Sequence, residues 1–80
     1  MSEEVTTLDA TELRCPLPVL RARKTLKSLA SGALMDVLAT DTAAPKDFEA
    51  FCGETGHTLI KIEQDGEVFT IRLRKKSREA

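Results

Sequence analysis

The stretch TLIKIEQDGEVFTIRL, residues 58–73, decides the fold. Two β-compatible runs, 58–64 and 68–73, flank the turn signal Asp65-Gly66, which is typical of a β-hairpin. In the second run apolar residues alternate with polar ones, Phe69, Ile71 and Leu73 against Thr70, Arg72 and Arg74. Such alternation gives a sheet one apolar face and one solvated face. Any helices of the chain must therefore cover the same, apolar face.

Two strands and two helices are expected before this hairpin. The strands are predicted at Val5–Asp9 and Leu34–Thr40, and the helices begin near Pro16–Pro18 and at Pro45. The first helix is predicted to extend until Gly32 ends it, because its apolar residues form a continuous arc on one side. This arc consists of Val19, Ala22, Leu26, Leu29, Ala30 and Ala33. The second helix is predicted to end at Gly56. One of its faces is formed by Phe48, Phe51, Cys52 and Thr55.

These elements predict an α+β fold, a two-layer α/β sandwich of order βαβαββ, with a four-stranded sheet and both helices on one face. The 80 residues form a single domain, 1–80, with about 1–4 and 76–80 expected to be flexible. No apolar run approaches the roughly 18–20 residues that cross a bilayer. The acidic start has no apolar signal region, so we expect no membrane association and a cytoplasmic monomer.

The charges are distributed in blocks although the net charge is only −1. Residues 13–35 hold five bases and no acid: Arg14, Arg21, Arg23, Lys24 and Lys27. Such a segment could attract an anionic partner, or it could be an ordinary solvated helix face.

The sequence Cys15-Pro16-Leu17-Pro18 is the most informative site. A residue before proline is disfavoured in α conformation, so Cys15 must lie at or next to the start of the first helix. Ser, Thr, Asp or Asn would be the usual choice there. A helix start, with Arg14 beside it, predicts a thiol pKa modestly below the usual value of about 8.5, although Asp9 and Glu12 oppose the shift. Pro16 and Pro18 stiffen the loop and display the sulfur.

The alternative for Cys15 is an ordinary half-buried cysteine. For Cys52 we expect a packed core thiol, because it shares a face with Phe48 and Phe51. His57 is expected to be structural or solvent-facing, and Asp41 to fix a loop through bonds to the backbone. Two cysteines and one histidine at these spacings predict neither a disulfide framework nor a metal site.

The chain resembles the TusA/SirA-like family of small sulfur carrier proteins over nearly its whole length. The resemblance rests on LDA (8–10), LRCPLP (13–18), KTL (24–26), ATD (39–41), DF (47–48), FC (51–52) and TGH (55–57). It implies a sulfurtransferase-type carrier that holds sulfur as a persulfide on Cys15. A cysteine desulfurase or rhodanese would supply the sulfur and an acceptor protein would receive it, with no metal or organic cofactor.

Two positions depart from the family pattern. Glu12 stands where relatives often have Gly, and Leu17 stands between the prolines where members that serve tRNA thiolation often have Glu. The CPLP form resembles carriers of broader sulfur trafficking, including sulfur oxidation. The residues do not identify the donor or the acceptor, nor distinguish tRNA thiolation, cofactor sulfuration and sulfur oxidation.

Two other functions compete with sulfur transfer. A small RNA-binding or regulatory module without thiol chemistry is suggested by a fold that resembles the C-terminal domain of a translation initiation factor. It is also suggested by a cluster of bases, Arg72, Arg74, Lys75, Lys76 and Arg78. Direct binding of nucleic acid is disfavoured because all three phenylalanines occupy predicted core positions, whereas single-strand readers need exposed aromatic rings. A Cys15–Cys52 redox pair is disfavoured by the apolar setting of Cys52.

The first helix also presents a candidate partner-binding surface. Leu17 and Leu20 point away from the apolar arc and lie beside Arg21 and Lys24. Apolar anchors with a charged rim are common in interfaces. Scattered exposed leucines are the alternative, since proteins tolerate them.

Overall fold

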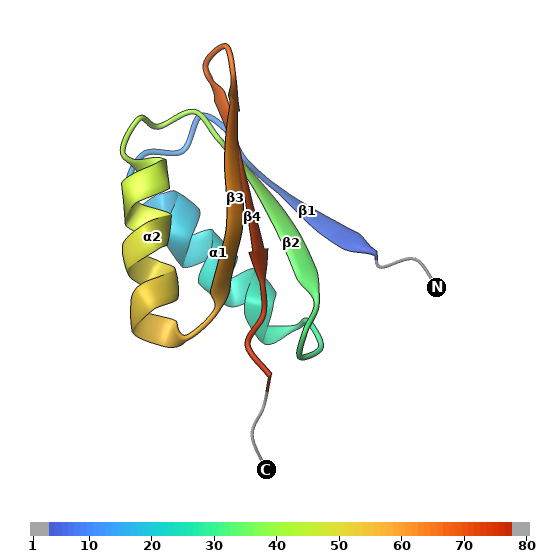
Figure 1. Cartoon of the computed structure of the whole chain (residues 1–80). Helices are drawn as coiled ribbons and strands as arrows, with labels where there is room; N and C mark the ends of the chain where they lie inside the picture. The colour runs from blue at the N-terminus through green and yellow to red at the C-terminus, as the bar shows by residue number, and fades with distance from the viewer. Residues whose placement is uncertain (1–3, 78–80) are drawn as a thin grey trace.

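The computed structural model describes residues 4–77 and confirms the predicted two-layer fold (Figure 1). The elements, in chain order, are β1 (Val5–Ala10), α1 (Leu17–Lys27), β2 (Leu34–Ala39), α2 (Ala44–Thr55), β3 (Thr58–Asp65) and β4 (Val68–Arg74). The flexibility expected at the chain ends concerns mainly residues 1–3 and 78–80, which lie outside the described residues. Lys76 lies inside them, and its backbone N–H donates to Nδ1 of His57.

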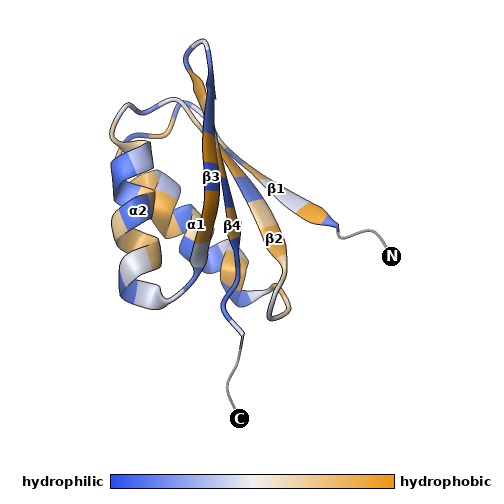
Figure 2. Ribbon diagram, in the orientation of Figure 1, coloured by the Kyte–Doolittle hydropathy of each residue, from blue (hydrophilic) through white to orange (hydrophobic). Residues whose placement is uncertain are grey.

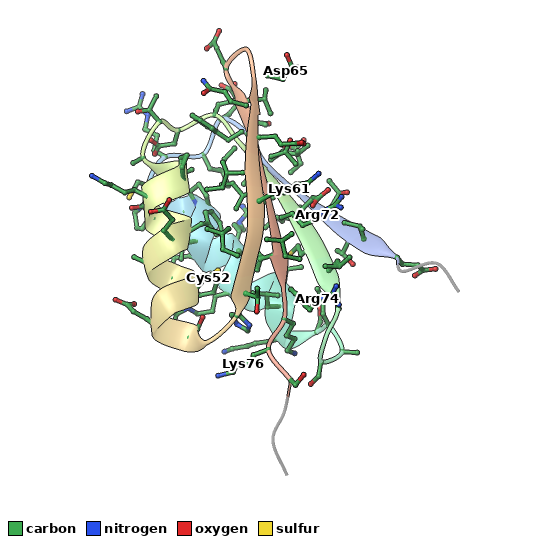
Figure 3. The ribbon with its side chains drawn as sticks, in the orientation of Figure 1. Cys52, Lys61, Asp65, Arg72, Arg74 and Lys76 are labelled. Atoms are coloured by element: carbon green, nitrogen blue, oxygen red, sulfur yellow. The ribbon has the colours of Figure 1, made fainter. Side chains whose placement is uncertain are left out.

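The sheet has the strand order β1-β2-β4-β3. β1 runs parallel to β2, whereas β4 pairs antiparallel with both β2 and β3. On the side away from the helices, Asp36 of β2 lies opposite Arg72 of β4. Arg72 donates from Nε and Nη2 to the two carboxylate oxygens of Asp36 at 2.7 and 2.9 Å. Figure 3 shows Arg72 and Arg74 extending from this solvated face.

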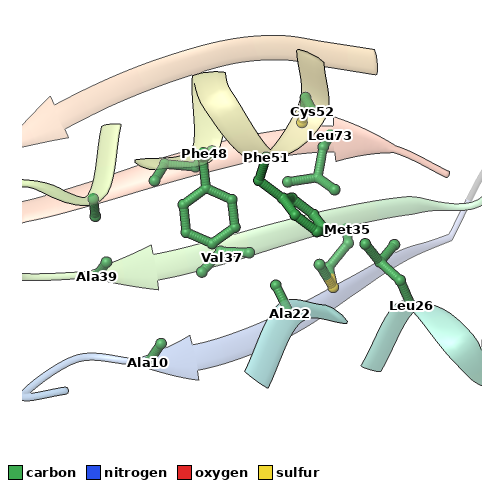
Figure 4. Packing of buried hydrophobic residues seen from close by; sticks show 12 residues of the cluster. Ala10, Ala22, Leu26, Met35, Val37, Ala39, Phe48, Phe51, Cys52 and Leu73 are labelled. Atoms are coloured by element: carbon green, nitrogen blue, oxygen red, sulfur yellow. The ribbon is translucent and has the colours of Figure 1, made fainter. Parts of the chain in front are cut away.

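The hydrophobic core lies between the sheet and the two helices. α1 packs on β1 and β2, and α2 packs on β3 and β4. Hydrophobic and hydrophilic residues alternate along these elements (Figure 2), as an arrangement with one buried face requires. The buried cluster, drawn in Figure 4, comprises Ala10, Ala22, Leu26, Met35, Val37, Ala39, Ala44, Phe48, Phe51, Cys52, Ile71 and Leu73.

The first helix is shorter than predicted, because it ends at Lys27 and not near Gly32. The Ser28 hydroxyl and the Ser28 N–H both donate to the Thr25 carbonyl, at 2.8 and 3.1 Å, which tightens and closes the last turn. Gly32, with φ of 84°, instead serves a separate turn in which the Ala33 N–H donates to the Ala30 carbonyl. Neither helix between residues 4 and 77 is long and apolar enough to cross a membrane.

Phe48 is the largest fully buried side chain, and it meets Phe51 edge-to-face with ring centroids 6.1 Å apart. We therefore expect Phe48→Ala to lower the free energy of unfolding by about 3–5 kcal/mol, because it leaves a cavity in the core. The measurement is urea denaturation. Leu20→Ala is the matched control. Because Leu20 is 51% exposed, this variant should lower the free energy of unfolding by no more than about 0.5 kcal/mol. Equal losses in the two variants would contradict the described core.

Candidate functional site

Cys15 lies in the loop between β1 and α1, where its free thiol is exposed. Pro16 is the N-cap of α1, so Cys15 stands one residue before the cap, and the peptide bond between the two residues is cis. The Leu17 N–H donates to the Arg14 carbonyl at 2.8 Å, which closes a turn around the cysteine. Pro18 is buried in the first turn of the helix. The motif therefore anchors the helix start through Pro18 and leaves the sulfur outside it.

Asp41 joins the loop of Cys15 to the start of the second helix. One of its carboxylate oxygens accepts the backbone N–H of Ala43 at 2.9 Å, and the other accepts the backbone N–H of Cys15. These two bonds, together with the charge of Arg14, hold the pKa of Asp41 below its usual value. The loop-fixing role expected for Asp41 is confirmed. Its bond to Cys15 was not predicted.

Glu12, one of the two departures from the family pattern, occupies a backbone position that favours glycine. Its φ is 70°, in the left-handed region that glycine enters freely and that costs other residues about 1–2 kcal/mol. The Glu12 N–H donates to the Thr40 hydroxyl at 2.9 Å, which ties this strained position to the end of β2. The backbone thus keeps the conformation that a glycine would favour, although the side chain is glutamate.

Two recesses in the surface meet at Cys15. One, of about 430 Å³, lies on the side of the β1–α1 and β2–α2 loops and is lined by Glu12, Leu13, Arg14, Cys15, Thr40, Asp41 and Thr42. The other, of about 210 Å³, lies between the two helices, and we call it the α1–α2 groove. It is lined by Cys15, Pro16, Val19, Arg23, Asp47, Ala50, Phe51 and Glu54. A sulfur at the junction of two open recesses is accessible to a group from another molecule.

The pKa of Cys15 is raised, so the predicted lowering is wrong. The largest cause is the nearby Asp47 carboxylate, followed by partial desolvation and by the negative charge of Asp41. No side chain caps α1, and the cap residue is Pro16, so the sulfur does not receive the helix N–H groups that would stabilise a thiolate. The positive charge of Arg14 acts on Asp41 instead.

Asp47 is the site residue that sequence reasoning missed. A signal was present, because Asp47 falls in the first turn of the helix that Pro45 begins, a usual place for an acid. Its closeness to Cys15 follows only from the parallel pairing of β1 and β2, which brings both helix starts to one edge of the sheet. That pairing was not among the sequence predictions.

The residues predicted to bind a partner are exposed on α1. Leu17 and Leu20 are 45% and 51% exposed, and Arg21 and Lys24 are exposed beside them. The structure thus presents all four on the helix that begins next to Cys15. We call Leu17, Leu20, Arg21 and Lys24 the α1 surface.

The surroundings of Cys52 and His57 indicate structural roles for both residues. Cys52 lies in the core at 6% exposure, as expected, and burial raises the pKa of its thiol. The His57 ring lies 5.5 Å from that of Phe51, and its Nδ1 accepts the Lys76 N–H at 3.0 Å. Burial and the nearby lysines lower the pKa of His57. Within residues 4–77, no group of three His, Cys, Asp or Glu side chains could hold a metal ion.

Comparison with known proteins matches this arrangement to a family of sulfur-handling proteins. The family described as "Sulfurtransferase TusA" matches residues 6–75. The sulfur carrier protein TusA of Allochromatium vinosum is 46% identical over 85% of this chain and 90% of its own length. That of Pseudomonas putida is 40% identical over 88% of each chain. A crystal structure of a SirA-like protein from Desulfitobacterium hafniense superposes with a TM-score of 0.78 at 25% identity, covering 92% of this chain and 100% of that one.

The bonds of Asp41 make the stability of the site depend on pH. A carboxyl group whose folded pKa lies below its ordinary value of 3.8 stabilises the fold above that value, and the contribution disappears as pH falls through the folded pKa. We therefore expect Asp41→Asn to melt a few degrees below the wild type at pH 7, and this difference to shrink as pH falls below about 3.8 towards the folded pKa of Asp41. The measurement is thermal unfolding followed by circular dichroism between these pH values.

Asp65→Asn is the matched control for this experiment, because it removes the same charge from the exposed hairpin turn and leaves an Asn-Gly turn signal. Its melting temperature should follow the wild type at every pH. A deficit of Asp41→Asn that stayed constant over the same fall in pH would show that the charge of Asp41 does not act through these bonds.

Proposed function

Because this chain belongs to the TusA family of sulfurtransferases, we propose that it accepts sulfur as a persulfide on Cys15 and relays it to a thiol of an acceptor protein. The observation that carries this proposal is the exposed thiol at the junction of two recesses. The other thiol, Cys52, is buried in the core and is not placed to meet another protein.

The proposed relay consists of two thiol-exchange steps extended by one sulfur atom. In the first, the Cys15 sulfur bonds to the outer sulfur of a donor persulfide while the S–S bond of the donor breaks. The bonding electrons leave on the donor's inner sulfur, which takes up the proton lost from Cys15. In the second, an acceptor thiolate attacks the outer sulfur in the same way and returns Cys15 to a thiol. No oxidant or cofactor is consumed.

The partners in this proposal are a donor enzyme of the cysteine desulfurase or rhodanese class and an acceptor protein with a reactive thiol. The relay would operate in the cytoplasm, where thiols are kept reduced. The acceptor would belong to tRNA thiolation, cofactor sulfuration or sulfur oxidation.

We assign partner docking to the α1 surface. Leu17 and Leu20 offer an apolar anchor, while Arg21 and Lys24 provide a positive rim. The α1 surface belongs to the helix whose first turn follows Cys15, so a partner bound there would lie close to the sulfur. A partner with an acidic rim around an apolar recess would complement it.

The two competing functions have less support. Phe48 and Phe51 are buried and Phe69 packs against the core, so no phenylalanine is available to stack on a nucleic-acid base. Cys15 and Cys52 are both free thiols, and the core position of Cys52 disfavours a disulfide between them.

Sulfur loading tests the assignment of Cys15. The protein is incubated with a cysteine desulfurase and cysteine, or with a rhodanese and thiosulfate, and its intact mass is measured. The wild type and Cys52→Ser should gain the mass of a sulfur atom, whereas Cys15→Ser should not. Loading of Cys15→Ser together with no loading of Cys52→Ser would overturn the proposal.

Charge and shape changes test the α1 surface. Leu20→Glu and the double variant Arg21→Glu, Lys24→Glu should fold normally and load normally with inorganic polysulfide, yet transfer sulfur to a partner protein about tenfold more slowly, as expected for a rim or anchor residue. The double variant should also show a weaker dependence of transfer on salt, since screening then has less attraction to remove. Lys61→Glu, on the solvated face of the sheet, is the control. Unchanged transfer in both test variants would place docking elsewhere.

A further inference from the structure

Basic side chains gather at the end of α1 that lies away from Cys15. Two recesses of about 700 and 300 Å³ adjoin there, and both are lined by Lys27, Lys75 and Lys76. No Asp or Glu among residues 4–77 lines either recess. The smaller recess is also lined by one arginine and one histidine. We call the five residues the basic cleft: Arg23, Lys27, His57, Lys75 and Lys76.

The cleft uses part of the cluster of bases near the C-terminal end of the sequence. Arg72 and Arg74 of that cluster serve the fold, because Arg72 donates to Asp36 at 2.7 Å and Arg74 donates to a backbone carbonyl at 2.8 Å. Lys75 and Lys76 follow the end of β4 and instead line the recesses beside α1. The fold thus brings bases from two distant parts of the chain to one concave place.

Hydrogen bonds fix the wall of the cleft that follows β4. The Lys75 N–H donates to the Ala33 carbonyl at 2.8 Å, and the Lys75 carbonyl accepts the Gly32 N–H at 3.0 Å. The Lys76 N–H donates to Nδ1 of His57 at 3.0 Å. The neutral imidazole therefore carries its proton on Nε2 and can donate it to a ligand. A wall held in this way needs little ordering when a ligand binds.

The positive charges of the cleft are not neutralised within the fold. None of its four basic side chains forms an ion pair with a carboxylate of residues 4–77. Arg23 lies over the ring of Phe51, 5.6 Å from its centroid, and Nζ of Lys75 donates to the Leu29 carbonyl. Both contacts leave the charge in place. A base in the last turn of a helix stabilises that helix, which accounts for Lys27 but not for the other three.

We propose that the basic cleft binds the linked phosphate groups of a small molecule. Four positive charges around two adjoining recesses suit a ligand with more than one phosphate group, and phosphate oxygens accept charge-assisted hydrogen bonds from lysine and arginine. Ser31 and Ser77 line the larger recess and add hydroxyl donors. Both recesses have volumes within the range of about 300–1,000 Å³ that is usual for small-molecule sites.

Two other anionic ligands fit these observations less well. An RNA strand is bound by phosphate contacts together with stacking of its bases, and all three phenylalanines lie in or against the core. An acidic protein segment spreads its charge along a chain, whereas linked phosphates concentrate it in the volume of a recess. The concave shape and the absence of stacking rings therefore favour a small phosphate compound.

The basic cleft is separate from the site of Cys15. α1 has 11 residues, so its first and last residues lie about 16 Å apart along the helix axis. Cys15 precedes the first turn of α1, whereas Lys27 is its last residue. Figure 3 shows Lys76 at the end of the molecule opposite Asp65 of the β3–β4 hairpin. The proposal therefore does not rest on the sulfur relay, and a thiol-free variant serves equally well in its test.

His57 reports directly on the cleft, because it is the single histidine of the chain. Burial and the charges of Lys76 and Lys75 lower its pKa, and Arg23 and Lys27 line the same recess from α1. A bound phosphate would offset these charges and favour the imidazolium. We therefore expect inorganic pyrophosphate to raise the pKa of His57, measured by NMR titration of its ring, relative to sodium chloride at equal ionic strength. An unchanged pKa together with unshifted backbone amide signals of the cleft would overturn the proposal.

Substitutions test which charges bind the phosphates. The double variant Lys27→Gln, Lys76→Gln should bind pyrophosphate about tenfold more weakly than the wild type in an NMR titration, since it removes two charge-assisted contacts. Lys46→Gln, Lys61→Gln is the matched control, because it removes the same charge from exposed positions that line neither recess. Its affinity should stay within about twofold of the wild type. Equal weakening in both double variants would overturn the site in favour of overall charge.

Two further measurements separate loss of charge from loss of structure and identify the class of ligand. The variant Lys27→Arg, Lys76→Arg keeps the charges and should keep the affinity, and circular dichroism checks that each variant is folded. A short oligouridylate and a short oligoglutamate, each of about the same charge as pyrophosphate, should bind more weakly than pyrophosphate. Tighter binding of the oligouridylate would overturn the small-molecule assignment in favour of an RNA backbone. Tighter binding of the oligoglutamate would overturn it in favour of an acidic protein segment.

Discussion

The parallel pairing of β1 with β2 is the constraint on which the site depends. Parallel strands end at the same edge of a sheet, so the segments after Ala10 and Ala39 emerge side by side and both helices begin there. Asp41 uses this closeness to bind the backbone of Cys15 and of Ala43 with one carboxylate. Without that pairing, Cys15 and Asp47 would have no reason to meet, because 32 positions of sequence separate them.

The two faces of the sheet are occupied by structural contacts. Its inner face is filled by the core, and its outer face carries the paired Asp36 and Arg72. A bidentate pair of this kind satisfies both charged groups within the fold. With the phenylalanines on the core side, the outer face lacks the stacking surfaces that a nucleic-acid binder of this architecture would need. The loop edge is where an exposed thiol and two open recesses coincide.

Periodicity predicted most of the fold, because burial of one sheet face dictates where helices lie. Periodicity placed the end of α1 too late, because Leu29 packs against the core as a helix residue would. Leu29 does so from the loop that follows the helix, and this loop begins where Ser28 bonds to the Thr25 carbonyl. The sulfur-bearing residue was also predictable, because a cysteine before proline stands out. Its electrostatics were not, because Asp47 and Asp41 come from a different part of the chain. Local sequence describes a helix start well, but it says nothing of the charges that the topology brings to it.

In the proposed relay Cys15 must be open to other proteins, and its place one residue before the N-cap of α1 suits that need. Had it been the N-cap residue, helix N–H groups would have favoured a thiolate at all times. It stands one residue earlier, so the proline motif leaves the sulfur exposed, while the carboxylates of Asp47 and Asp41 raise the pKa of its thiol. Nearby carboxylates raise the pKa of the Cys15 thiol without covering the sulfur, whereas burial, as at Cys52, raises the pKa of a thiol and also closes it to other molecules.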